Sequence, residues 1–447
     1  MKLVSLKNRV KLSELKPVRL LVIAAILHLS VAFIIFWIGR SSIAPNLFDS
    51  NGIAVSFAYD SVHYQLEAKS LADMLTRREI IAWLTASSQF HVKLYSRCFM
   101  LFGPWVGFNI IAVEPLNLLY YLAILCLVFR LGREIFGQHE GLLSATMIGL
   151  WPSFLLHTTQ LLRDPLFIIL MLLLVLIITR WLVKVYRLSD GLITGLSAAA
   201  VSLGLFLIRV DAWVIVQVAV FVAAGLVAIR QWNQRCILPG NVLGALLLLA
   251  AIVIIPQAST TILNRIGGNP IFSVTEQHLP LWQRITKRRQ VSIETGVANA
   301  GSNLDTDVKL NSQVDVLQYL PRASEIGFFA PFPETWFRAG TRGGLPGRLL
   351  SGLETLVIYV VDLAACFSIW LMRRRLAVWL LVIIAVAGII ALGLVVVNVG
   401  TLYRMRYLFE MLLIVLGAKG LISLFSLICR SLSTEKLVYT ERKPGAS

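Results

Sequence analysis

The residue with the clearest potential for chemistry is Asp60, which lies in the stretch from Ala58 to Ala68, just after the first long apolar segment. This position places a carboxylate on a loop close to a membrane surface, with aromatic neighbours at Tyr59 and Tyr64. A carboxylate of this kind can accept a proton from a hydroxyl group. An aspartate also commonly caps a helix N-terminus, and Asp60 taken alone fits that structural role as well.

Further charged residues are expected at the outer ends of apolar spans, where ionisable groups are costly and often functional. They are Arg163 with Asp164, Arg209 with Asp211, and Arg404 with Arg406. Guanidinium groups that converge on one surface bind phosphate through bidentate hydrogen bonds. If Asp60 faces them, the set favours transfer of a group from a phosphate donor. The carboxylate would deprotonate an acceptor hydroxyl, and the arginines would stabilise the departing phosphate.

These charges also have structural interpretations. Arg163 fits equally well as an anchor at the lipid headgroups, and Asp164 before Pro165 makes a natural helix start. Arg209, two residues before Asp211, fits equally well as a partner in a local ion pair. The two arginines before the last span are unusual as anchors, because they lie within one turn, and they favour a functional role.

The composition indicates an integral membrane protein. Of 447 residues, 57% are hydrophobic and 15% are charged, and the mean hydropathy is +0.77. A soluble protein carries about 25% charged residues. Runs of about 20 apolar residues predict an all-α polytopic membrane protein with about ten transmembrane helices. The predicted spans lie near residues 18–39, 108–130, 140–157, 164–183, 190–209, 212–230, 241–257, 353–372, 376–397 and 406–428.

Short basic loops predict the orientation of these spans. Lys and Arg gather at the N-terminus and at residues 130–133, 180–187, 230–235 and 373–375. With ten spans, all of these segments fall on the cytoplasmic side, together with both termini. The net charge of +17 is then explained by the membrane, and no nucleic-acid-binding motif accompanies it.

Two long segments are expected on the opposite side. Residues 40–107 form a first outer loop, with amphipathic helices predicted on the membrane surface at 64–83 and 92–102. Residues 258–351 are polar and predict a small extracytoplasmic subdomain. The predicted division is a transmembrane catalytic module at 1–257, the subdomain at 258–351, C-terminal transmembrane helices at 352–430 and a cytoplasmic tail at 431–447.

One metal-like pattern occurs in the second outer segment. Asp305-Thr306-Asp307 has the form of a metal-binding Asp-x-Asp, but such triplets are common in polar loops and no third oxygen ligand is in view. No metal is assigned, and the cofactor is left unknown, with a divalent metal still open. The five cysteines show no metal-ligand spacing.

Several short motifs carry a family resemblance. Asp60, Tyr64 and Ala68 match an Asp-x3-Tyr-x3-Ala loop, and Tyr403–Tyr407 looks like an arginine-bearing turn before a last core helix. Between Lys93 and Trp181 the motifs are Leu94-Tyr95, Leu101–Gly103, Arg133–Gly137, Leu150–Ser153, Leu155–Thr158 and Leu161–Leu166. Together they resemble the GT-C class of membrane glycosyltransferases, similar to protein mannosyltransferases and aminoarabinose transferases.

The resemblance implies a glycosyltransferase that moves a sugar from a polyprenyl-phosphate-linked donor to a glycan, lipid or protein acceptor on the extracytoplasmic face. By position, Asp60 would be the catalytic carboxylate. The residues implied to bind substrate are Tyr64, Arg163, Asp164, Arg209, Arg404 and Arg406. Many members of the class have two adjacent acidic residues in the first loop, whereas Ser61 follows Asp60 here, which puts a metal-assisted variant in doubt.

Two other functions stay open. Phe329–Glu334 resembles an aromatic-proline motif of bacterial membrane proteins from surface-polysaccharide loci. This implies a multi-pass protein of the bacterial inner membrane and keeps a polysaccharide polymerase or ligase as an alternative. A transporter or flippase of lipid-linked sugars predicts inverted repeats and broken helices at mid-membrane, and the sequence shows neither clearly. The expected partners are the lipid-linked donor, the acceptor and membrane lipid, without nucleic acid.

Overall fold

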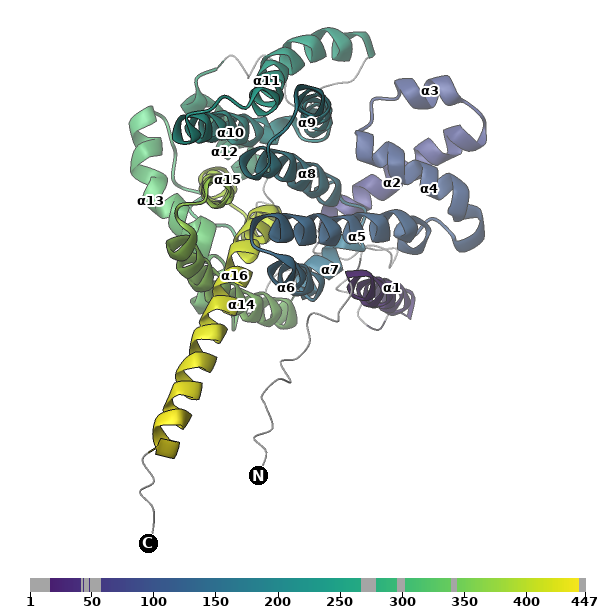
Figure 1. Cartoon of the computed structure of the whole chain (residues 1–447). Coiled ribbons are helices and arrows are strands. Elements are labelled where there is room, and N and C mark those ends of the chain that lie inside the picture. Colours follow the sequence, from purple (N-terminus) through teal and green to yellow (C-terminus); the bar gives the residue numbers. More distant parts are fainter. Residues whose placement is uncertain are drawn as a thin grey trace.

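The fold is a bundle of long apolar helices. The structure is a computed structural model that describes residues 17–41, 43, 48, 58–266, 279–295, 302–338 and 344–441. Nine helices in these ranges are long and apolar enough to cross a membrane, and the pairing between Asn303 and Asn398 is an isolated bridge outside any strand. The prediction of an all-α polytopic membrane protein is therefore confirmed. The nine helices are α1 (Pro17–Ser41), α5 (Ile110–Ile135), α8 (Asp164–Val183), α9 (Leu188–Ile208), α10 (Trp213–Gln234), α11 (Pro239–Ile266), α14 (Gly344–Met372), α15 (Leu376–Val395) and α16 (Val399–Glu441) (Figure 1).

The remaining predicted span, at 140–157, is divided into α6 (Gln138–Gly149) and α7 (Pro152–Thr158). Pro152 has no backbone N–H and occupies the first position of α7, so one continuous helix is interrupted there. The segment thus forms two short helices and not one long apolar helix.

The two short helices together still run along α5. Near the far end of α6, the Tyr121 hydroxyl of α5 donates to the Gly149 carbonyl oxygen at 2.7 Å. At the end of α7, Thr158 and Glu114 of α5 contact the two ring nitrogens of His28 at 3.1 and 2.7 Å. Helices α6 and α7 together therefore extend along α5 as far as its first turns, as one transmembrane segment with a break in the middle would.

Ion pairs bring the basic loops to one end of the bundle, here called the basic end. Lys184 Nζ lies 2.6 Å from Glu134 Oε1, and Lys419 Nζ lies 3.1 Å from Glu140 Oε1. Arg375 also donates to the Ile135 carbonyl oxygen. The loops after α5, α8 and α14 are thus neighbours, as the charge pattern predicts. That this end faces the cytoplasm remains a prediction.

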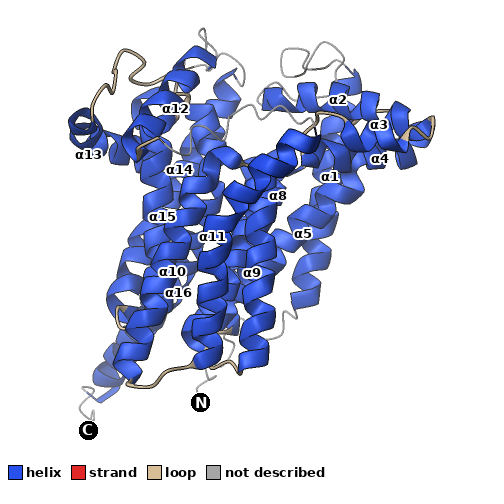
Figure 2. Cartoon of the chain, turned by 90° about the horizontal axis from the view of Figure 1, so that it is seen from above, coloured by secondary structure: helices blue, strands red, loops and turns tan. Residues whose placement is uncertain are grey.

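The opposite end, here called the outer end, carries the non-spanning helices (Figure 2). The described residues of the first outer loop form three helices instead of the two that were expected. The first of them packs against the other two, and the third packs on α5. Helices of the second outer segment pack on α15. These helices are α2 (Tyr59–Thr76), α3 (Ile80–Thr85), α4 (Phe90–Val106), α12 (Leu281–Thr295) and α13 (Gln313–Phe329).

The second outer segment has its own polar anchors. Arg289 of α12 is 2% exposed and donates to the Leu394 carbonyl oxygen at the end of α15. Asp305 Oδ2 accepts from Arg322 and from the Tyr319 hydroxyl, both at 2.9 Å, and the Arg322 hydrogen bond lowers the pKa of this carboxyl. In the described ranges no group of three His, Cys, Asp or Glu side chains is placed to hold a metal. Asp305 therefore has a structural role here.

The predicted segment boundaries do not coincide with helix ends. Helix α11 extends past 257 to Ile266, α14 begins at Gly344 before 352, and α16 continues past 430 to Glu441. Of the predicted cytoplasmic tail, residues 442–447 lie outside the described residues. The division of the chain into functional segments stays a prediction.

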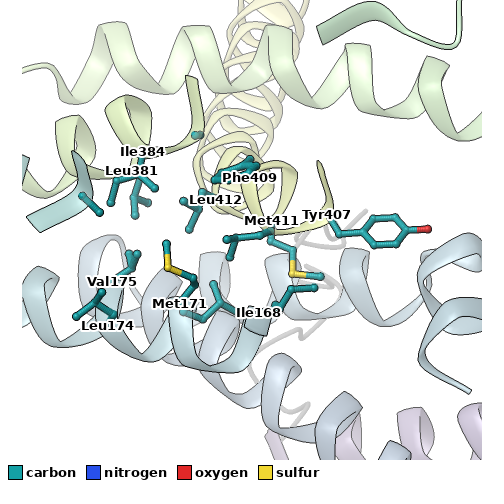
Figure 3. Close-up of a cluster of buried hydrophobic side chains, with 14 of the residues drawn as sticks. Ile168, Met171, Leu174, Val175, Leu381, Ile384, Tyr407, Phe409, Met411 and Leu412 are labelled. Atoms are coloured by element: carbon teal, nitrogen blue, oxygen red, sulfur yellow. The ribbon is translucent and has the colours of Figure 1, made fainter. Parts of the chain in front are cut away.

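The core joins α8, α15 and α16 (Figure 3). Ile168 and Met171 of α8 face Leu381 and Ile384 of α15 and the side chains of α16. Lipid is as apolar as these side chains, so the helices associate through close van der Waals packing, helped by small residues at the contacts. This packing fixes α8 and α16, whose outer ends carry the charged residues singled out in the sequence.

A close contact at a glycine between α14 and α16 gives a test of how tightly the helices pack. A Cβ built at Gly420 would come within 1.9 Å of the Ala364 carbonyl oxygen, a distance that only a shift of one helix relieves. We expect Gly420→Ala to destabilise the protein by about 1–3 kcal/mol, measured as a lower thermal midpoint in detergent. Gly225→Ala is the matched control, since its Cβ would meet nothing within 4 Å. Equal midpoints for both variants would contradict the close contact.

Candidate functional site

Asp60 lies in the first turn of α2. The residue before the helix is Ala58, and no side chain caps this helix, so Asp60 does not have the capping role considered from the sequence. Ser61 Oγ accepts from the Leu161 N–H at 3.3 Å, and Gln65 Nε2 donates to the Phe108 carbonyl oxygen at 2.8 Å. These bonds hold the start of α2 against the turn before α8 and against the segment before α5.

A chain of ion pairs connects four segments at the outer end: α2, the start of α8, the turn between α9 and α10, and α16. Arg404 Nη2 of α16 lies 2.6 Å from Asp60 Oδ2, and Arg404 Nε lies 2.9 Å from Asp164 Oδ2. The other oxygen of Asp164 accepts from Arg209 Nη1 at 2.9 Å, and Arg209 Nη2 lies 3.5 Å from Asp211 Oδ2. Five of the charged residues singled out in the sequence therefore form one network.

The two carboxylates that contact Arg404 differ in accessibility. The Asp60 side chain is 46% exposed, whereas the Asp164 side chain is 7% exposed. A buried carboxylate is stable only when it is paired, and the two guanidinium groups beside Asp164 meet this need. Asp164 therefore positions Arg209 and Arg404 more directly than it caps α8. Asp60 is the carboxylate that an incoming hydroxyl group can reach.

Arg163 lies beside this network and differs from the other arginines. Its guanidinium makes no hydrogen bond or ion pair with any residue that the structure describes, although the charges of Asp60, Asp164 and Asp211 act on it. Tyr64, one helical turn after Asp60, is also within its electrostatic reach. Burial raises the pKa of Tyr64, so its hydroxyl stays neutral and able to donate. Arg163 is thus a cation available to an anionic ligand.

Arg406 does not join the other arginines. It is 1% exposed, pairs with Glu410 at 2.9 Å and donates to the carbonyl oxygens of Gly327 and Ala330. Residues two positions apart on a helix point in nearly opposite directions, so Arg404 and Arg406 cannot both face one ligand. Arg406 attaches the end of α13 to α16, and we leave it out of the proposed site.

A small pocket adjoins Arg404 and Asp164, and the sequence analysis did not identify most of its residues. Its lining residues come from α7, α8, α16 and the turn before α8. They are Phe154, His157, Thr158, Leu162, Asp164, Pro165, Ile168, Arg404 and Tyr407. The pocket has a volume of only about 10 Å³, and the surface that it exposes is apolar. It lies beside the ion pairs of Arg404 and Asp164 without offering room for a ligand larger than water.

Glu354 of α14 supports the turn that carries Arg404. Its Oε1 accepts from the Ser153 N–H at 2.7 Å and its Oε2 accepts from the Tyr403 hydroxyl at 2.5 Å. A carboxylate at the start of α7 also interacts favourably with the helix dipole. Nothing in the sequence indicates this role, because Glu354 stands alone near the start of a predicted apolar span. It fixes the residue next to Arg404.

Three ionisable residues inside spans lie away from this network. His28 is fully buried and hydrogen-bonded at both nitrogens, to Glu114 and Thr158, so both residues of the His28–Glu114 pair are engaged with each other away from the site. Asp362 lies near Glu410, whose charge acts on it.

Comparisons with known proteins concern the fold alone. The sequence matches no family model and no curated relative. The structure is similar to the apo crystal structure of the Archaeoglobus fulgidus oligosaccharyltransferase, with 14% identity and a TM-score of 0.48, covering 96% of this chain and 53% of that one. It is also similar to the oligosaccharyltransferase AglB of that archaeon in complex with an inhibitory peptide and a dolichol-phosphate, with 15% identity, a TM-score of 0.48, and coverage of 96% and 52%. This chain spans about half the length of both.

Proposed function

We propose that this integral, multi-pass membrane protein is a glycosyltransferase that moves a sugar from a polyprenyl-phosphate-linked donor to an acceptor at the outer end. One observation carries the proposal: Arg163, Arg209 and Arg404, from three different parts of the chain, converge on Asp60 and Asp164, and Arg163 has no partner among the described residues. Such a site binds an anion next to a reachable carboxylate. The proposal rests on this chain's own residues.

A bound phosphate would change the contacts of Asp60. Arg404 Nη2 lies 2.6 Å from Asp60 Oδ2, and a carboxylate oxygen engaged by a guanidinium is less available to an acceptor hydroxyl. A donor phosphate competes for Arg404, because guanidinium groups bind phosphate bidentately. Donor binding therefore releases Asp60 from its ion pair and leaves the carboxylate free to accept a hydrogen bond from the acceptor hydroxyl.

In the transfer step, the acceptor oxygen forms a bond to the anomeric carbon of the sugar and loses its proton to Asp60. The bond between that carbon and the phosphate oxygen breaks, and its electron pair stays on the phosphate. Arg163 and Arg404 stabilise the charge that develops there, which is often the largest contribution to catalysis.

The direct test is a transfer assay on purified protein in detergent. A polyprenyl-phosphate-linked sugar is the donor, and the assay is run with and without a chelator because no metal requirement is assigned. Sugar transfer without any ion gradient would support the enzyme and exclude a pure transporter or flippase. Absence of transfer from a panel of such donors would remove the proposal.

Arg163 gives a more specific test. We expect Arg163→Gln to weaken donor binding and to raise KM by about tenfold, since hydrogen bonds to charged groups contribute about 1.5–3 kcal/mol. The matched control is Arg77→Gln, an exposed arginine of the first outer loop. An unchanged KM for Arg163→Gln would show that the unpartnered guanidinium does not contact the donor.

A polymerase or ligase of surface polysaccharide is the second candidate. One contact supports it. Arg406, two residues after Arg404 on α16, donates to the carbonyl oxygens of Gly327 in α13 and of Ala330 in the aromatic-proline segment. Product length separates the two functions: a polymerase makes long chains, and a single-sugar transferase makes one addition. For either function we propose a location in the bacterial inner membrane, with the outer end on the extracytoplasmic side.

A further inference from the structure

His91, the second residue of α4, is a buried imidazole without hydrogen bonds. Its side chain is 1% exposed, and within the part of the chain that the structure describes neither ring nitrogen has a hydrogen-bond partner. Leaving a buried polar group unpaired costs about 1–3 kcal/mol. An unsatisfied group of this kind requires an explanation, and a bound ligand is one.

The surroundings of His91 indicate the class of that ligand. Its ring meets the Tyr64 ring edge-on at 4.5 Å, and the Tyr95 ring of its own helix at 6.3 Å. The charged groups that act on it are Arg163, Asp164 and Arg209, and the Arg163 charge is the strongest of the three. Tyr95, one helical turn after His91, donates to the carbonyl oxygen of Leu162, the residue before Arg163, at 3.0 Å. The helix that carries the unpartnered imidazole thus packs against the turn that carries the unpartnered guanidinium, which favours an anion.

His91 is neutral in its buried position. Burial, and after it the charge of Arg163, lower the pKa of His91 to about 3. A bound anion would oppose both effects, because it pairs with the imidazolium and offsets the positive charge of Arg163. The pKa of His91 would then rise by about 1–3 units, so that the protonated form is favoured at mildly acidic pH.

We propose that His91 and Arg163 together bind the phosphate of the lipid-linked donor, and that His91 takes up one proton from solvent as the phosphate binds. The inference rests on the proposed function and extends it to a residue of the first outer loop. The Tyr64 ring contacts the imidazole edge-on at 4.5 Å, so we expect this ring to shift when the phosphate binds. Tyr64 also lies one turn after Asp60, so this movement occurs next to the proposed base.

Proton uptake gives binding a characteristic pH dependence. The pKa of His91 is higher in the complex than in the free protein, so affinity is greatest at low pH. It falls by up to about tenfold per pH unit as the pH rises through the pKa of the complex. A neutral partner such as a serine or an amide in place of His91 would give no such slope.

The experiment uses the full-length protein and a ten-carbon prenyl phosphodiester that carries a methyl group in place of the sugar. A phosphodiester keeps one charge over the range studied, unlike a phosphate monoester, which titrates near pH 6. Calorimetry at pH 5 in two buffers of different ionisation enthalpy measures the protons taken up. We expect about one proton for the wild-type protein, and none for His91→Asn and His91→Gln. His63→Asn, an exposed histidine of α2, is the matched control and should behave as wild type.

Three outcomes would overturn the inference: no binding of the phosphodiester, binding without proton uptake, or uptake that persists in both His91 variants. The wild-type measurement needs no variant, so a folding defect in His91→Asn leaves the test intact. Sugar transfer is measured separately with the intact donor. Proton-coupled binding without sugar transfer would reject the proposed function and keep the phosphate site at His91. Sugar transfer without proton uptake would keep the proposed function and reject the role of His91.

Discussion

Asp60→Asn should reduce sugar transfer by about 10²–10⁴-fold, the range in which a positioned general base contributes. Asparagine keeps the size of the side chain and can still accept a hydrogen bond from Arg404, so the outer end should keep its structure. It cannot accept the acceptor's proton at neutral pH. The measurement is the initial rate of transfer with saturating donor, together with size-exclusion chromatography of the purified variant.

The control for this variant is Asp73→Asn, which removes an exposed carboxylate of the same helix. It should transfer sugar at the wild-type rate. Donor affinity separates the proposed roles further, because Asp60→Asn removes a competitor for Arg404 and should therefore bind the donor as tightly as wild type or more tightly. An Asp60→Asn protein that keeps its activity would remove Asp60 as the base, whatever its effect on binding.

The spans and their ends follow from the sequence because they depend on local properties. Apolar length predicts the long helices, and the charge of the loops predicts that the basic ones gather at one end. The same reasoning placed Asp60, Arg163, Arg209 and Arg404 at one end of the bundle. It could not show that Arg404 lies 2.6 Å from Asp60, because 344 residues separate them and only the packing of α2 on the bundle brings them together.

Other features depend on helix phase or on distant contacts, which one sequence does not reveal. Arg404 and Arg406 look alike in the sequence, but their directions on α16 differ, and Glu410 one turn later is a partner for Arg406. His91 is an isolated histidine in the first outer loop, and no spacing links it to Arg163. Glu354 likewise acquires its role from α7 and α16. Tertiary packing decides all three.

Arg404→Ala should have an effect of the same order as that of Asp60→Asn, because Arg404 is the residue that connects the two carboxylates. Its removal takes away a proposed phosphate contact and leaves Asp164 with Arg209 as its remaining ion pair. We expect kcat/KM to fall by about 10³-fold, the size of effect seen when one preorganised charge-stabilising group is lost. Arg404→Lys should recover little, because a single ammonium cannot hold two carboxylates with the geometry of a guanidinium. Arg77→Ala, at an exposed position of the first outer loop, is the control.

The combined variant decides whether Asp60 and Arg404 act as one unit. If donor binding must move Arg404 from Asp60 to the phosphate, the two residues contribute to the same step, and their effects are not additive. The protein with both Asp60→Asn and Arg404→Ala should then be no slower than the slower single variant, with both rates measured at saturating donor. If the two losses multiply instead, the residues act independently. The 2.6 Å ion pair would then be a structural contact of the empty site and not the switch that activates the base.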